Sequence, residues 1–397
     1  MSAPHPDFMR NIGILSGCQA LFFCANAMII STTALVGQQI APSSSLATLP
    51  LGLQFLATMA STMTASLLMA RVGRRTGLMI GGCFAVLSGL IGWHAIMTGS
   101  FVPFSVSAAL YGVFAAFAAY YRFAAADAAD PPRTARAISY VLAGGVVAGV
   151  LGPELAKRTL HLFDPILFAG TYLFVGVLGA MTVVLLFFLT IPKPRASELG
   201  GEKRPLSEIA RQPTFILAVA AAITAYVVMN LLMTATPLAM VACGFGFEQS
   251  AFVIQGHVLG MFAPSFFTGH LISRFGTMRV IGAGAGLLMG CIALHLSGIE
   301  LVHFTLGLIA LGVGWNFMFI GATALLTHAY RPAEKAKVQG LNDLLLFFCV
   351  ALSATSSGAL HEWIGWQAMN LIALVMILSL TLVLLTWRPK MRVAGAV

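Results

Sequence analysis

The sequence predicts an all-α membrane protein in which twelve transmembrane helices form two six-helix bundles. Three observations support this prediction. The chain is 59% hydrophobic and only 9% charged, whereas a soluble domain has about 25% charged residues. Windows of about 20 residues show twelve apolar segments, each long enough to cross a bilayer as a helix. The basic residues fall almost entirely in alternate loops between these segments.

The twelve apolar segments follow one another along the chain, six before and six after a long polar stretch. Several contain polar residues, which is typical of helices that line a polar cavity in a membrane protein. Their expected bounds are 11–36, 45–69, 77–98, 101–124, 137–156, 166–190, 213–240, 249–273, 280–298, 302–328, 338–360 and 365–387.

The distribution of Lys and Arg gives the predicted topology. If the N-terminus is cytoplasmic and each segment crosses once, all of the 22 basic residues except Lys157 and Arg158 lie on the cytoplasmic side. This follows the positive-inside rule, so we predict a multi-pass protein of the bacterial inner membrane with both termini in the cytoplasm. The net charge of +9 then reflects topology and attraction to anionic lipid headgroups, and it does not indicate nucleic-acid binding.

The longest polar stretch of the chain, 191–211, contains Pro, Gly and charges of both signs. Such a composition is typical of a flexible linker. It predicts three parts: an N-terminal six-helix bundle (1–190), a cytoplasmic linker (191–211) and a C-terminal six-helix bundle (212–397).

The two halves also contain similar loops. Arg71 and Arg274 are 203 positions apart, and Gly73 and Gly276 have the same separation. A second pair of loops contains Pro132 and Pro332, 200 positions apart, each followed by a basic residue and Ala. Recurrence at nearly one offset, in equivalent loops, indicates an internal repeat.

These loops resemble the signature of the major facilitator superfamily, and the resemblance covers nearly the whole chain. The matching residues, which the resemblance assigns to cytoplasmic gate loops, are Arg71, Gly73, Arg74, Arg75, Gly269, Arg274 and Gly276. The family has an acidic latch residue where this chain has Ala70 and Ser273. We expect the loop arginines to bond carbonyls at helix C-termini instead.

The resemblance implies a monomeric carrier whose two bundles rock about a central site to give alternating access. The sequence shows no nucleophile–base spacing and no Gly-x-x-x-x-Gly-Lys motif, so we expect neither an enzyme nor an ATPase, and no permanently bound cofactor. An ion or substrate gradient then supplies the energy. Asp343 and His257 are the candidate proton carriers, and uniport is equally open.

Two residue pairs suggest the substrate. Met229 with Met233, and His257 with Met261, are each four positions apart and therefore share a helix face. If the two segments form an antiparallel hairpin, the pairs lie at equal depth. Three thioethers and an imidazole suit Cu(I), and Cys243 lies close to the centre of this hairpin. Gap-filling methionines and a structural histidine are the alternative interpretation.

The same stretch resembles the CcoA-like copper importers, a branch of the superfamily with Met-x-x-x-Met and His-x-x-x-Met on the seventh and eighth helices. That branch also contains carriers associated with riboflavin, which are similar around Thr236–Met240. The resemblance implies copper import for cytochrome oxidase assembly, with copper as the transported substrate. The alternatives are import of riboflavin or a similar flat solute, and proton-coupled drug efflux, which a glycine-rich fifth segment (143–153) suggests.

We also expect Pro237 and Pro264 to kink their helices, because each removes a backbone hydrogen bond from the helix interior.

Overall fold

The computed structural model describes residues 6–43, 46, 49–191 and 204–386, and all regular structure in this part of the chain is helical. Eleven of its helices are long and apolar enough to cross a membrane, and a bent pair, taken as one span, makes a twelfth. The predicted all-α fold with twelve spans is therefore confirmed. Helices suit this environment because each satisfies its own backbone hydrogen bonds in a solvent that offers none.

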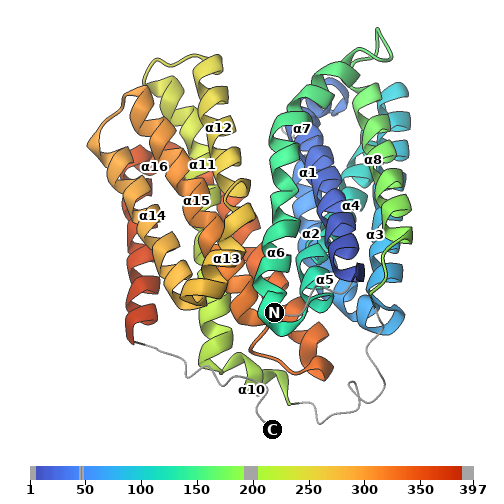
Figure 1. Cartoon of the computed structure of the whole chain (residues 1–397). Helices are drawn as coiled ribbons and strands as arrows, with labels where there is room; N and C mark the ends of the chain where they lie inside the picture. The colour runs from blue at the N-terminus through green and yellow to red at the C-terminus, as the bar shows by residue number, and fades with distance from the viewer. Residues whose placement is uncertain (1–5, 44–45, 47–48, 192–203, 387–397) are drawn as a thin grey trace. The chain divides into compact units, whose positions relative to one another are not determined.

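The helices of the first sequence half follow the predicted order (Figure 1). The fourth and fifth spans are each divided into two consecutive helices. The bounds are α1 (Pro6–Ile40), α2 (Leu49–Val72), α3 (Arg74–Met97), α4 (Phe101–Ala118), α5 (Tyr121–Asp127), α6 (Thr134–Ala143), α7 (Gly145–Leu160) and α8 (Ala169–Phe187).

The second half repeats this plan after a short helix. Gly365, with φ 77°, interrupts the last helix, so that it supplies both the eleventh and the twelfth span. The bounds are α10 (Leu206–Ala210), α11 (Pro213–Ala242), α12 (Phe247–Phe262), α13 (Ser265–Phe275), α14 (Thr277–Ser297), α15 (Leu301–Leu326) and α16 (Lys335–Thr386).

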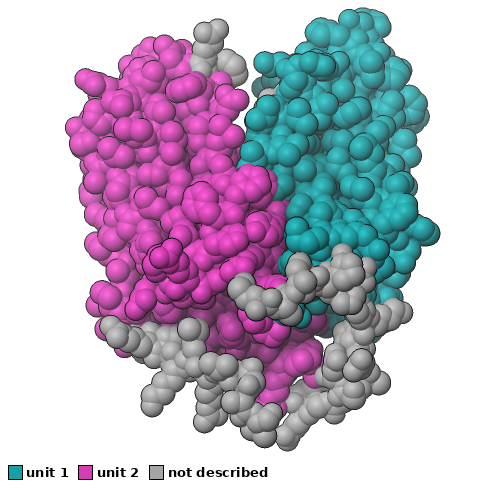
Figure 2. Space-filling model, viewed as in Figure 1, with its two compact units in different colours: residues 1–130, 144–196, 339–344 teal, residues 131–143, 197–338, 345–397 magenta. Residues whose placement is uncertain are grey.

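The chain forms two compact units, coloured separately in Figure 2. Unit 1 comprises residues 1–130, 144–196 and 339–344, and unit 2 comprises 131–143, 197–338 and 345–397. The units therefore differ from a division at the linker by two short segments. Helix α6, from the first sequence half, packs against α13 within unit 2. The division into two six-helix bundles at residues 190 and 212 stays a prediction.

Two glycines at equivalent positions of the predicted repeat have the same backbone conformation. Gly73, between α2 and α3, has φ 90° and ψ 160°, and Gly276, between α13 and α14, has φ 88° and ψ 152°. Residues with a Cβ rarely adopt this conformation. The same turn thus recurs 203 positions later, at the loops that carry the family-like motif.

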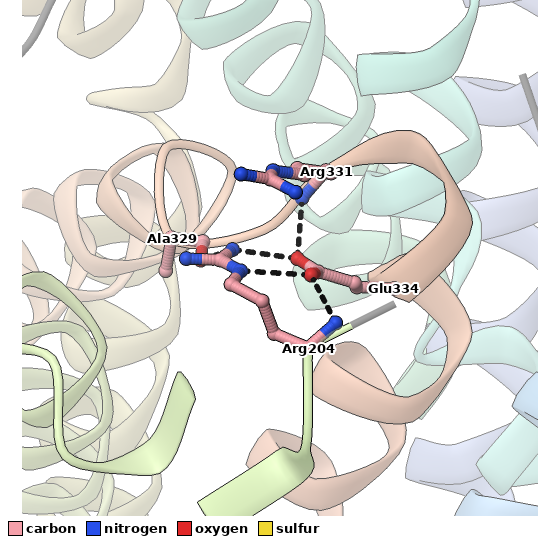
Figure 3. A network of polar contacts seen from close by, with 4 residues as sticks. All are labelled: Arg204, Ala329, Arg331 and Glu334. Carbon is pink, nitrogen blue, oxygen red and sulfur yellow. Dashed lines mark hydrogen bonds and ion pairs between the residues drawn. The ribbon is translucent and has the colours of Figure 1, made fainter. Parts of the chain in front are cut away.

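Residues 204–211, the C-terminal part of the predicted linker, include helix α10 and a hydrogen-bonded arginine; the flexible linker itself stays a prediction. Figure 3 shows the Arg204 guanidinium against the Glu334 carboxylate. Arg204 Nε lies 2.8 Å from Glu334 Oε1, and Arg204 Nη2 lies 2.6 Å from Glu334 Oε2. The backbone N–H groups of Arg204 and Arg331 donate to the same carboxylate, at 3.0 Å and 2.9 Å. The side-chain hydrogen bond with Glu334, followed by the attraction of its carboxylate, raises the pKa of the Arg204 guanidinium above its ordinary value, so Arg204 stays charged.

Gly269 tests the contact of α13 with α6. A Cβ at this position would lie 2.6 Å from Arg136 Cα and 2.8 Å from Ala135 O. Because both neighbours are backbone atoms, we expect Gly269→Ala to lower the free energy of unfolding by roughly 1–3 kcal/mol. Thermal unfolding of the purified protein in detergent measures this. Gly282→Ala in α14, where a Cβ meets nothing within 4 Å, is the matched control. Equal melting temperatures for the two variants would contradict the argument.

Arg204 tests the linker contact. In Arg204→Ala the Glu334 carboxylate, in a residue only 2% exposed, keeps its two backbone donors but loses the guanidinium. We expect a loss of roughly 1–3 kcal/mol in the free energy of unfolding, seen as a lower melting temperature. Arg204→Lys keeps the charge but loses the two-pronged geometry, so its loss should be smaller. Arg211→Ala, an exposed position in the same segment, should leave the melting temperature unchanged.

Candidate solute-binding site

Helix α15 is the main packing partner of α11, α12 and α14 in unit 2. The sequence pairs α11 with α12 as a hairpin, but each of these helices packs more extensively along α15 than against the other. The residues that this arrangement buries include His257 on α12 and Trp315 and Asn316 on α15, all with 0% exposure.

His257 faces α15 and makes one hydrogen bond to a described residue. Its Nδ1 lies 2.9 Å from the carbonyl oxygen of Leu308. A carbonyl only accepts, so Nδ1 carries the proton and donates it. The other ring nitrogen, Nε2, is buried and has no hydrogen-bond partner among the described residues. A buried acceptor without a partner is costly, so this atom needs an explanation.

The other residues of the predicted metal site have different environments. Met229 and Met261 are buried, Met233 is half-buried, and Cys243 is exposed at the C-terminal end of α11. The described residues contain no group of three or more His, Cys, Asp or Glu side chains placed to hold a metal. A copper site here would therefore depend on the thioethers, and the metal site stays a prediction.

The eighth span is broken where the sequence predicts a kink. Pro264 separates α12 from α13, and the two helices are bent by 41°. The break is repaired from α15: Asn316 Nδ2 donates to Met261 O and to Ser265 Oγ, both at 2.6 Å. Thr268 Oγ1 donates to Asn316 Oδ1 at 2.6 Å. Helix α11, in contrast, continues without interruption through Pro237.

An aromatic cluster surrounds Trp315. Phe319 stacks on its ring at 5.0 Å, and Tyr226 meets the same ring edge-on at 5.1 Å. Phe262 of α12 completes the cluster, 6.0 Å from the Trp315 ring. Sequence reasoning missed this group. The available signal was a Trp-Asn dipeptide at positions 315 and 316 in an otherwise apolar span.

One face of α11 beside this cluster is polar and partly exposed. Tyr226, Asn230 and Met233 are half-buried, and Thr234 is exposed. Thr234 Oγ1 lies 3.5 Å from Asn230 Oδ1. An amide and a hydroxyl facing lipid would cost free energy, so polar residues at such positions mark a face that meets water or solute.

Asp343, the other candidate proton carrier, is fully buried within unit 1. Its Oδ1 accepts hydrogen bonds from Arg122 Nη2 and from Asn342 Nδ2, the latter at 2.8 Å. The guanidinium compensates the buried carboxylate, as buried charges require. Its proton-coupling role, like that of His257, stays a prediction.

Arginines of the predicted gate loops bond other partners than the helix C-terminal carbonyls that we expected. In unit 1, Arg74 Nε donates to Asp127 Oδ2 at 2.9 Å and its Nη2 donates to Gln339 Oε1 at 2.6 Å. Arg74 thus bonds a carboxylate and an amide side chain, because Asp127 supplies an acid from α5. Two other loop arginines lie over aromatic rings: Arg75 over Phe187 at 4.7 Å and Arg274 over Phe275 at 5.2 Å.

The helices and the loop motifs define a polytopic membrane transporter. A family model described as Major Facilitator Superfamily matches residues 15–354 and 258–395, and the chain belongs to this family. It is therefore a secondary transporter.

Relatives and solved structures agree with this assignment. The chain is 41% identical over 390 residues to the riboflavin transporter RfnT of Brucella anthropi, and the aligned region covers 98% of each chain. It is 31% identical to the uncharacterized MFS-type transporter YdeG of Bacillus subtilis, over 94% of this chain and 90% of that one. The proton:xylose symporter XylE has the same fold, with a TM-score of 0.79 at 13% identity over 96% of both chains.

Asn316 tests the repair of the helix break. Asn316→Leu keeps the number and branching of the side-chain heavy atoms but removes both N–H donors, leaving Met261 O and Ser265 Oγ without them. We expect a loss of roughly 2–4 kcal/mol in the free energy of unfolding, measured as a fall in melting temperature in detergent. Ser297→Ala, at the exposed end of α14, is the control and should be neutral. A neutral Asn316→Leu would show that the break needs no external donor.

Proposed function

We propose that this transporter imports riboflavin or a similar flat organic solute. The observation that carries the proposal is the 41% identity to a riboflavin transporter, sustained over 98% of both chains. Identity over the full length includes every helix of both halves, so it reflects more than a shared fold. The similarity to the proton:xylose symporter XylE, at 13% identity, concerns the fold alone.

The chemistry of unit 2 is compatible with such a solute. Aromatic side chains stack on flat conjugated rings, and amides bond the donors and acceptors at the ring edge. Tyr226 and Asn230 offer both groups on the partly exposed face of α11. The deep parts of the spans lack Lys, which disfavours a strongly anionic solute.

Copper import, the first hypothesis from the sequence, has weaker support. It depends on the spacing of the Met and His pairs, and His257 already uses Nδ1 to bond Leu308 O. Nε2 remains as a metal donor, so the hypothesis forms a second arm of the test. We further propose a monomer in the bacterial inner membrane with cytoplasmic termini, alternating access and no permanently bound cofactor.

Uptake by a riboflavin-auxotrophic bacterium tests the main proposal. Expression of the chain should restore growth at riboflavin concentrations too low for the parent strain, and cells should accumulate flavin measured by fluorescence. An empty vector is the control, and detection of the protein in the membrane fraction establishes expression. If the protein is present in the membrane fraction but growth is not restored, the proposal is contradicted.

The copper arm measures cellular copper by ICP-MS in cells that express the wild type, His257→Ala or Met233→Ala. A riboflavin carrier should leave cellular copper the same in all three strains. Copper accumulation with the wild type that both substitutions abolish would favour the first hypothesis.

A further inference from the structure

Helices α1 and α11 each present an aromatic residue and an asparagine on one partly exposed face. Phe22 and Asn26 lie four positions apart on α1, and so do Tyr226 and Asn230 on α11. Four positions place both members on the same helix face. All four side chains are half-buried.

These two pairs are related by the internal repeat. Phe22 and Tyr226 are 204 positions apart, and Asn26 and Asn230 have the same separation. Farther along the same helices, Thr32 Oγ1 donates to Met28 O at 2.8 Å and Thr236 Oγ1 donates to Leu232 O at 2.7 Å. These threonines are also 204 positions apart. Sequence, exposure and a local hydrogen bond therefore repeat together.

The aromatic partners repeat at the same offset. Within unit 1, Phe22 stacks against Tyr111 with ring centroids 6.4 Å apart and an interplanar angle of 11°. Within unit 2, Tyr226 lies edge-on to Trp315. Tyr111 and Trp315 are 204 positions apart, and both are fully buried. In each unit a buried ring thus supports a half-buried ring beside an amide.

Each unit also contains a buried polar side chain with an unsatisfied atom at an equivalent position. Gln54 and His257 are 203 positions apart, with exposures of 2% and 0%. Gln54 Nε2 lies 3.5 Å from Asn26 Oδ1, whereas Gln54 Oε1 and His257 Nε2 have no partner among the described residues. The Nδ2 groups of Asn26 and Asn230 also donate no hydrogen bond to a described residue.

Hydrogen-bonding capacity left unused inside a membrane protein is unfavourable unless a ligand or water meets it. Here the unused groups comprise donors and acceptors. In both units the asparagine amide lies on the same helix as a half-buried aromatic ring that packs against a fully buried ring. That combination suits a flat heteroaromatic ring system with N–H and carbonyl groups on its edge, and it offers no charge to an ionic solute.

We infer that each unit, taken by itself, has a specificity-determining face for the solute: Phe22 with Asn26 in unit 1, and Tyr226 with Asn230 in unit 2. The aromatic ring contacts the face of the solute ring, and the amide bonds its edge. Gln54 positions Asn26. The inference rests on the proposed function, because riboflavin supplies the ring.

The internal repeat also indicates a hydrogen-bonding role for His257 that needs no metal. Its counterpart is Gln54, which hydrogen-bonds through an amide, so what recurs at this position is a buried hydrogen-bonding side chain. His257→Gln should therefore retain solute binding, whereas His257→Leu should weaken it. A thioether–imidazole copper site would lose copper in both variants.

The experiment titrates the purified full chain in detergent with riboflavin and with lumichrome, which has the fused rings but no ribityl chain, and follows flavin fluorescence. Phe22→Leu and Tyr226→Leu remove a ring, and Asn26→Leu and Asn230→Leu remove an amide. Each should raise Kd about tenfold for both ligands. Tyr226→Phe keeps the ring and should stay within about threefold of the wild type. Leu35→Ala and Leu238→Ala, at exposed apolar positions of the same helices, are the matched controls.

Gel filtration and melting temperature establish folding of every variant. Asn26→Ser and Asn230→Ser replace the asparagine-to-leucine variants if these fail to fold. If the wild type binds riboflavin and the four substitutions leave Kd within about twofold, the inference is overturned and the proposed function stands. If riboflavin is neither bound nor transported by the wild type, the proposed function fails and the inference fails with it. Loss of affinity in the controls equal to that in the four variants also overturns the inference.

Discussion

The absence of water in the bilayer interior is the constraint on which the rest of this structure depends. Every backbone donor and acceptor there needs a partner from the protein, so long helices are the default and each interruption must be repaired. The eighth span shows such a repair. Pro264 breaks it, and Asn316 on α15 donates to Met261 O and Ser265 Oγ at the break. An asparagine in the middle of an apolar span is thus explained by a neighbouring helix.

The same constraint explains why the two sequence halves remain alike. A buried polar group has few acceptable replacements, because its partner must change with it. Turns at Gly73 and Gly276, and threonine hydrogen bonds at Thr32 and Thr236, therefore recur at offsets of 203 and 204. Lipid-facing positions carry no such requirement. The repeat is consequently clearest at the polar and glycine positions.

Hydropathy and charge suffice to predict the spans, because chain length against bilayer thickness is a one-dimensional property. The rotation of a helix about its own axis depends on its neighbours in three dimensions, so hydropathy and charge do not predict it. Met229 and His257 are correctly placed on consecutive spans, but the sequence does not show that α12 turns His257 toward Leu308 of α15. The Arg204–Glu334 pair was missed for a related reason, since its members are 130 positions apart and neither lies in a periodic pattern. Contacts between distant segments leave no local signal.

A residue's repeat counterpart can decide between chemical roles that its own spacing leaves open. His257 and Met261 satisfy a copper motif by spacing alone. Gln54 occupies the position equivalent to His257 and bonds Asn26, and its Oε1 has no partner in the part of the chain that the structure describes. An amide is a poor ligand for a soft metal. Both positions are buried, and hydrogen bonding is the role that the two side chains can share, although their partners differ. Hydrogen bonding is common to glutamine and histidine, whereas Cu(I) coordination is not, which supports the proposal of an organic solute with polar ring edges over copper.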